Sequence, residues 1–242
     1  MPISRYTLVF VSIFLASTAL FTRADNLQEQ FAEAQYTFDQ TLAKDLLPQY
    51  EQLAQSADTE SAWLDYAAAA LLVAELIRGD YEYSSVAKKE KRELGRKIDR
   101  VANIALKALT TLPDSSERYR LEADLLGTMI RSRFKGMKYQ ERLEQAIAKA
   151  LELDDKNADA WVSNAKRPLF AAEKHGGEPA LALEYLNRAL EIHPEHVQAL
   201  IFRGVAHTKL GESALAEEDW ALAEKLNPNI AGVPEQLLDI EV

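Results

Sequence analysis

The residues best suited to chemistry are two histidines, His193 and His196, in the stretch HPEH. Two imidazoles three positions apart on one helical face could ligate a metal ion. Pro194 stands between them, however, and proline ends a helix, so the pair straddles a turn instead of sharing a face. The spacing of the other residues indicates no third ligand, and the chain has no Cys. We therefore predict neither a metal nor a cofactor.

Motifs for catalysis are missing from the sequence. It contains no Gly-x-Ser-x-Gly elbow, no Walker loop, no dinucleotide-binding glycine fingerprint and no His-Glu-x-x-His pair. Carboxylates are numerous, but Asp and Glu on helices usually form the solvated face, so no particular pair stands out as acid and base. The sequence therefore predicts a protein that is not an enzyme.

Composition narrows the fold class and the kind of partner. The chain has 242 residues, with 38 Asp and Glu against 28 Lys and Arg, and a net charge of −10. This excess of acid argues against nucleic-acid binding, which depends on neutralising phosphates with basic residues. Gly and Pro are few, at 9 and 8 residues, while Ala, Leu, Glu and Lys are abundant. We predict an all-α protein with no nucleic-acid partner.

The first 24 residues differ from everything after them. Arg5 is followed by an uncharged, apolar run of 16 residues over 6–21, and Asp25 opens a polar segment. A run this short does not reach the roughly 20 residues that span a bilayer. It predicts a cleaved signal peptide over 1–24, with a retained membrane anchor as the alternative. An exported chain without Cys, and so without disulfides or a lipid-modified Cys, fits the periplasm of a Gram-negative cell best.

A spacing of 34 residues connects the last two units of the chain. Several residues in 212–228 have a residue of similar size or type 34 positions earlier in the chain. The matched pairs are Ala216 with Ala182, Trp220 with Leu186, Ala223 with Ala189, and Pro228 with Pro194. An earlier unit follows the same offsets once five extra residues are allowed in 168–179, where Gly-Gly and two Pro indicate a loop. The sequence is therefore built from repeated helix pairs.

Residues 195–228 resemble the tetratricopeptide repeat. Gly204 and Ala223 are small residues where paired helices approach closely, Trp220 fills the space beside them, and Pro228 ends the second helix. Two residues depart from the family pattern, Arg203 in place of the usual Leu and His207 in place of the usual Tyr.

Two earlier segments match the same repeat less completely. Residues 156–194 match in the second helix and at Trp161, and residues 120–155 match in the second helix alone. The resemblance implies an α-solenoid of stacked antiparallel helix pairs over 114–242. A short capping helix is expected over 233–242, which begins near Pro234 and is apolar at Leu237, Leu238 and Ile240.

The N-terminal region, residues 25–113, is helical without a clean repeat. We expect it to form diverged helices that pack on the stack, because single units of a stack cannot bury their apolar faces alone. Its expected helices cover 27–55, 62–79 (ending at Gly79-Asp80) and 84–111.

The resemblance implies an inner face lined by the first helix of each unit. By position its residues are Asp159, Val162, Lys166, Gln198, Ile201, Val205 and Thr208. Relatives that grip C-terminal carboxylates place Lys and Asn at set positions, two of which hold Ile201 and Val205 here. We therefore expect a mixed apolar groove for a peptide or partner helix. The alternative is that Ile201 and Val205 only pack against the next unit.

Basic residues gather in the turns between the two helices of each unit. In a stack, these turns align along one edge, whose residues are Arg131, Arg133, Lys135, Lys138, Arg167 and Lys174. Such an edge could dock an acidic partner. The simpler explanation is that the charges complement the negative C-terminal ends of the first helices. The charged run 88–97 is expected to be a solvated helix face.

These observations predict a non-enzymatic scaffold or assembly factor in the cell envelope, with a protein or peptide as its partner. The alternative is a small-molecule-binding accessory of a periplasmic solute uptake system, since some periplasmic helical-repeat proteins resemble this arrangement. An enclosed pocket would favour the accessory protein. An open groove with an exposed apolar strip would favour the scaffold.

Overall fold

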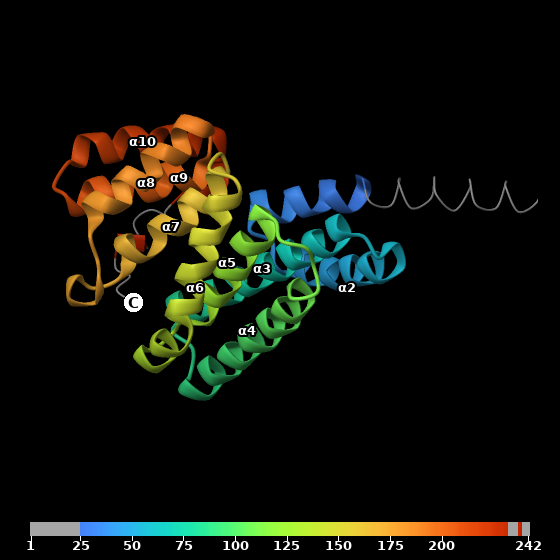
Figure 1. Ribbon diagram of the computed structural model, residues 1–242. Helices are drawn as coiled ribbons and strands as arrows, with labels where there is room; N and C mark the ends of the chain where they lie inside the picture. The colour runs from blue at the N-terminus through green and yellow to red at the C-terminus, as the bar shows by residue number, and fades with distance from the viewer. Residues whose placement is uncertain (1–24, 232–236, 239–242) are drawn as a thin grey trace, which may run out of the picture.

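Helices make up all the regular structure that the described residues show (Figure 1). The computed structural model describes residues 25–231 and 237–238, so the predicted signal peptide over 1–24 lies outside it. None of the described helices is both long enough and apolar enough to span a bilayer. The elements are a helix over 25–37, α2 (Gln40–Ala57), α3 (Glu60–Tyr83), α4 (Lys88–Leu109), α5 (Ser116–Met129), α6 (Arg133–Leu153), α7 (Ala158–Phe170), η1 (Glu173–His175), α8 (Pro179–Ile192), α9 (Val197–Lys209), α10 (Ser213–Leu226) and η2 (Pro228–Ile230).

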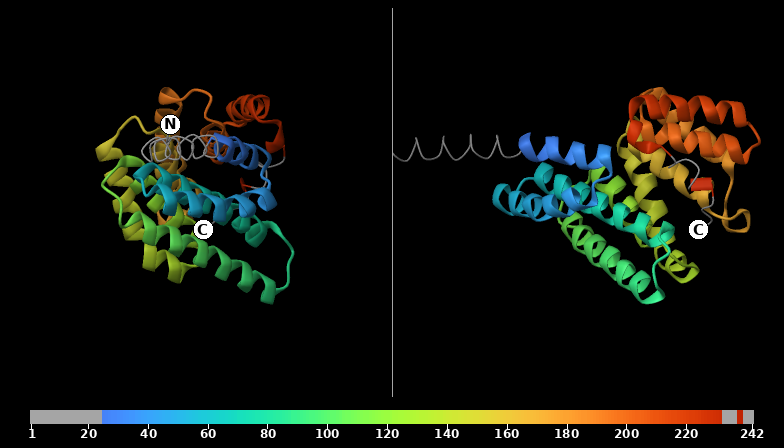
Figure 2. Two further views of the ribbon diagram at one scale, coloured as in Figure 1. Left: turned by 90° about the vertical axis from the view of Figure 1, so that its right-hand side faces the viewer. Right: turned by 180° about the vertical axis from the view of Figure 1, so that it is seen from behind.

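Helices that follow one another in the chain pack side by side as antiparallel pairs. The pairs are α3 with α4, α5 with α6, α7 with α8, and α9 with α10. The first helices of successive pairs also touch, because α5 contacts both α3 and α7, and α7 contacts α9 (Figures 1 and 2). This arrangement confirms the predicted fold class, an α-solenoid of stacked antiparallel helix pairs.

The small residues predicted at the helix crossings are buried. Ala182, Ala189, Ala216 and Ala223 are all buried, as is Leu186 between the first two. In the last pair, Gly204 of α9 lies directly against the indole ring of Trp220. The 34-residue spacing therefore marks equivalent close contacts within α7–α8 and α9–α10.

Both departures from the repeat pattern belong to one charged cluster between α9 and α10. Arg203 binds the buried carboxylate of Asp219 through two nitrogens, at 2.8 Å from Nε and 2.5 Å from Nη2. His207 Nδ1 lies 2.7 Å from Glu212, and its Nε2 lies 3.8 Å from Asp219. A charged contact thus joins these two helices where the family usually has Leu and Tyr.

Apolar side chains form two main cores. The first is shared by the helix over 25–37 and by α2 to α5, and the second by α7 to α10 and η2. Ala123 of α5 and Ala146 and Ile147 of α6 form a smaller cluster. Leu237 and Leu238 pack against the second core, and the rest of the expected capping helix over 233–242 lies outside the described residues.

The helices of the N-terminal region differ from their expected bounds. The segment 27–55 is two helices, because Phe38 adopts a positive φ of 55° and Asp39 caps α2 by accepting hydrogen bonds from the backbone N–H groups of Thr41 and Leu42. Helix α3 does not end at Gly79-Asp80 but continues to Tyr83. The turns of α3 before Gly79 are buried in the first core. This burial stabilises the helix by more than a single glycine destabilises it.

The expected loop over 168–179 begins later than the sequence indicates. Helix α7 includes Pro168 and ends at Phe170. The ring of Phe170 packs edge-on against Phe202 of α9 at 5.2 Å between centroids, which holds this last turn on the second core.

One hydrogen bond joins the two ends of the stack. The side-chain amide of Asn227, which is buried after α10, donates to the backbone carbonyl of Tyr36 at 3.1 Å. Tyr36 lies in the helix over 25–37, so the last helix pair contacts the first described helix of the chain.

Candidate functional site

The apolar residues predicted for the inner groove are buried. Val162, Ile201 and Val205 all belong to the second core. They pack within the stack, as the alternative for Ile201 and Val205 anticipated, and in this structure they present no apolar strip to a partner.

The polar residues of the predicted groove remain in contact with solvent. The side chain of Asp159 is 59% exposed, and Lys166, Gln198 and Thr208 are half-buried. These four lie on the first helices α7 and α9, which touch one another. What the inner positions offer to a partner is therefore polar and charged.

Asp124 of α5 organises a group of charged residues that includes Lys166. Its carboxylate is buried and accepts from Lys166 Nζ at 2.7 Å and from Arg120 Nη1 at 2.9 Å. The hydroxyl of Ser163 also donates to it, at 2.8 Å. Asp124 thereby connects α5 to α7 and fixes the position of the Lys166 ammonium.

Glu75 of α3 is the second acid near Lys166, at a longer distance of 3.8 Å. Burial raises the pKa of Glu75, and the negative charge of Asp124 adds to the rise. The pKa of Lys166 is also raised, because the attraction of Asp124 and Glu75 outweighs the effect of its burial. Lys166 lies closer to Asp124 than to Glu75, so its attraction to Asp124 is the stronger of the two.

His196, in the HPEH stretch, connects the start of α9 to α7. Its Nδ1 accepts a hydrogen bond from the backbone N–H of Ala199 at 3.3 Å, so its Nε2 carries the proton donated to Asp159 at 3.0 Å. This hydrogen bond is the main reason that the pKa of Asp159 is lowered to about 2. Among the residues that the structure describes, no group of three or more potential ligands lies together.

Half of the residues of the predicted basic edge form ion pairs with other residues of the same chain. Arg131 binds Asp99 at 2.7 Å, Lys135 binds the same carboxylate at 2.5 Å, and Arg167 pairs with Glu144. The remaining members, Arg133, Lys138 and Lys174, are exposed and form no ion pair with any described residue.

Two exposed apolar residues beside this edge were not predicted from the sequence. Phe134 and Met137 lie in the first two turns of α6, and each is 71% exposed. The signal was present in the stretch RFKGMK, where each apolar residue has a basic neighbour four positions away. Its meaning depends on knowing that α6 begins at Arg133 and that the side chains of Phe134 and Met137 are left exposed there.

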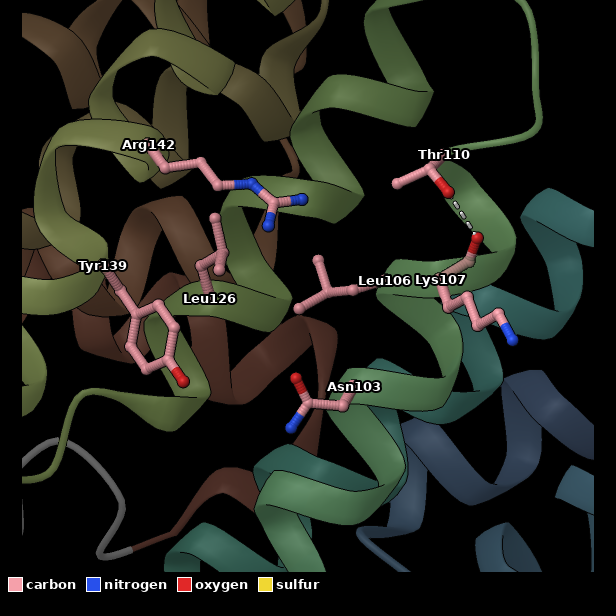
Figure 3. A pocket seen from close by; sticks show the side chains of 7 residues that line it. All are labelled: Asn103, Leu106, Lys107, Thr110, Leu126, Tyr139 and Arg142. Carbon is pink, nitrogen blue, oxygen red and sulfur yellow. Dashed lines mark hydrogen bonds between the residues drawn. The ribbon is translucent and has the colours of Figure 1, made fainter.

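A recess of about 220 Å³ lies between α4, α5 and α6 (Figure 3). Leu106 and Leu126 supply its apolar part, and Lys107 and Arg142 are its basic residues. Arg142 already binds Glu122 at 2.7 Å. Because the recess is smaller than the roughly 300–1,000 Å³ of typical ligand sites, it does not favour the small-molecule-binding alternative.

The fold and these surfaces define a class of protein, an all-helical stack of antiparallel helix pairs with a tetratricopeptide-like arrangement. No protein-family model matches the chain, and none of the curated proteins matches it. Solved structures similar to it include a crystal structure of MamA, with 14% identity, a TM-score of 0.40, and coverage of 79% of this chain and 92% of that chain. A second crystal structure of MamA shows 17% identity, a TM-score of 0.42, and coverage of 76% and 93%. The class itself is assigned from the helix packing described above.

Proposed function

We propose that the protein is a non-enzymatic scaffold or assembly factor that binds a protein or peptide partner in the cell envelope. Within this proposal it is an exported protein of the tetratricopeptide type, located in the periplasm after loss of residues 1–24. The observation that supports partner binding is the row of solvent-accessible polar residues on successive first helices, held in place by contacts between those helices.

The inner-face residues are pre-organised by their internal partners. Lys166 is fixed by Asp124 at 2.7 Å, and Asp159 is fixed by His196 at 3.0 Å. Side chains that are already ordered lose less conformational entropy when a partner binds. This favours recognition of a polar or charged peptide at the inner positions over binding of an apolar helix.

We assign the partner site to the inner face and not to the basic edge. Three of the six predicted edge residues form internal ion pairs, and the other three lie in two separate places, Arg133 and Lys138 at the start of α6 and Lys174 in η1. The inner positions, by contrast, lie on two helices in direct contact.

The proposal is tested by affinity capture from an envelope extract, followed by identification of the proteins that co-purify. The inner-face variant carries Gln198→Arg and Thr208→Arg, which place bulky charge at two half-buried positions. Its matched control carries Ala221→Arg and Glu224→Arg at exposed positions of α10.

We expect a specific protein to co-purify with the wild-type chain and the control, and to be lost from the inner-face variant. Circular dichroism melting would establish that both variants remain folded. Equal capture by the two folded variants would refute the inner-face site. Absence of any specific protein from all the captures would refute the scaffold itself.

A further inference from the structure

Two basic segments that are distant in the sequence lie together at one end of the molecule. They are the start of α4, with the run 88–97, and the turn and first residues of α6, over 131–138. Arg131 joins them by donating to the backbone carbonyl of Gly95 at 2.9 Å and to Asp99 at 2.7 Å. Figure 1 shows both helix starts at the lower end of the view, and the right-hand view of Figure 2 shows the same end from behind.

Charge is concentrated at this end with a sign opposite to that of the whole protein. Residues 88–99 and 131–138 hold ten Lys and Arg side chains and three carboxylates, in a chain whose net charge is −10. Six of the ten are exposed and form no ion pair with a described residue. These six are Lys88, Lys89, Arg92, Lys97, Arg133 and Lys138.

Phe134 and Met137 add an apolar tip to this basic end. They are three positions apart on α6, so they share one side of the helix. At 71% each, they are the most exposed of the large apolar residues that the structure describes. Lys138 and Arg133 stand one helical turn from Phe134 and Met137 respectively.

The segment that carries the tip is held firmly to the rest of the molecule. Lys135 and Arg131 both bind Asp99 of α4, and the Arg131 guanidinium also lies over the ring of Tyr81, at 5.5 Å from its centroid. Lys91 Nζ lies 4.7 Å from the centroid of the same ring. The exposed apolar pair is therefore presented by an anchored turn.

We propose that this end of the molecule, which we call the basic–apolar tip (residues 88–97 and 131–138), docks on an anionic lipid bilayer surface. Phe134 and Met137 enter the boundary between headgroups and acyl chains, and the surrounding Lys and Arg residues bind anionic headgroups. The contact is peripheral and reversible, and it does not depend on the partner site of the inner face.

Three features favour a bilayer over an acidic protein at this surface. The apolar side chains stand out from the start of a helix, as insertion between headgroups requires. Six positive charges with no ion-pair partner among the described residues are spread over two helix starts, which suits the diffuse charge of many headgroups. The acidic remainder of the protein is repelled by the same surface, so the tip would be the part that faces it.

The test is co-sedimentation of the full chain, as processed by the cell, with vesicles of phosphatidylcholine and phosphatidylglycerol in equal parts. Vesicles of phosphatidylcholine alone report any binding by residues 1–24 or by apolar contact in general. One variant carries Phe134→Ser and Met137→Ser, and another carries Arg133→Glu and Lys138→Glu. Matched controls carry Leu215→Ser with Leu222→Ser, and Lys156→Glu with Lys225→Glu, all at exposed positions away from the tip.

We expect salt-sensitive binding to the anionic vesicles, weakened about tenfold or more in each tip variant and unchanged in the controls. Equal binding of wild type to both kinds of vesicle would overturn the proposal. Undiminished binding of the tip variants would also overturn it. If the tip residues instead capture an acidic protein while vesicles do not bind, the surface is a protein-binding site and the bilayer proposal fails.

Discussion

Trp220 donates a hydrogen bond from its indole Nε1 to the backbone carbonyl of Ile201 at 3.1 Å, and its ring lies against Gly204. A Cβ atom at position 204 would be only 2.1 Å from that nitrogen. The ring of one helix thus touches the backbone of the other, which is possible only with glycine at this crossing.

Gly204→Ala is expected to destabilise the protein by about 1–3 kcal/mol, because the rigid ring must move and lose its hydrogen bond. This cost exceeds the gain of roughly 1 kcal/mol from replacing a helical glycine by alanine. The matched control is Gly79→Ala in α3, where nothing lies within 4 Å and the gain alone is expected. Urea unfolding measures both, and an equal gain in the two variants would show that the crossing is not tight.

Ala223→Leu is expected to cost about 1–3 kcal/mol by overpacking the contact between α9 and α10. Ala223 is fully buried, whereas Ala221 on the same helix is exposed. Ala221→Leu should therefore change stability little. Thermal unfolding of both variants tests the packing, and indistinguishable melting temperatures would contradict it.

Asp124→Asn should destabilise the protein by about 2–3 kcal/mol, because Lys166 and Arg120 lose a buried charged partner. Glu75 and Glu117 still lie close to these cations, which limits the loss. Lys149→Gln, which breaks the solvent-exposed pair with Glu152, is expected to change stability little, because water screens such a pair. Chemical denaturation compares the two, and similar small effects would mean that Asp124 does not organise this region.

The stability of the protein is expected to depend on pH through Asp159. The hydrogen bond from His196 is the main cause that lowers the pKa of Asp159 to about 2 from its usual 3.8. The folded protein favours the charged carboxylate, so the stabilisation is present above pH 3.8 and is lost as the pH falls through about 2. The difference in melting temperature between wild type and Asp159→Asn should therefore shrink over that range. It should be small, because the side chain is more than half exposed. NMR titration of the carboxyl group measures the pKa directly, and a value near 3.8 would contradict the bond to His196.

Sequence reasoning succeeded where short-range spacing decides the structure. Alanine at 182, 189, 216 and 223 can be recognised from one chain because only small residues fit where paired helices cross. The same spacing defines the units that form α7–α8 and α9–α10.

Contacts between units could not be predicted from the sequence. Asp124 and Lys166 are 42 positions apart, and Asn227 and Tyr36 are 191 positions apart. Such pairs depend on how the units rotate relative to one another, which no local pattern encodes. Ile201 and Val205 are buried by the same packing, so their side chains do not line an apolar groove in this structure.

The charged residues show a similar division. The sequence predicts Arg131, Arg133, Lys135 and Lys138 in one turn, whereas the last three lie in α6 and only Arg131 precedes that helix. Asp99 of α4, which is distant in the sequence, binds Arg131 and Lys135. The run 88–97 was expected to be only a solvated face, and its place beside this turn emerges from the pairing of α4 with α5 and of α5 with α6.

Site-specific photo-crosslinking tests the scaffold proposal most directly. Benzoylphenylalanine would replace Gln198 or Thr208 at the inner positions, and Ala221 on the exposed side of α10 as the control. The account predicts that both inner positions crosslink, in an envelope extract, to the protein that co-purifies with the wild-type chain, and that Ala221 does not. Crosslinks to that protein from Ala221 alone, with none from the inner positions, would contradict the account.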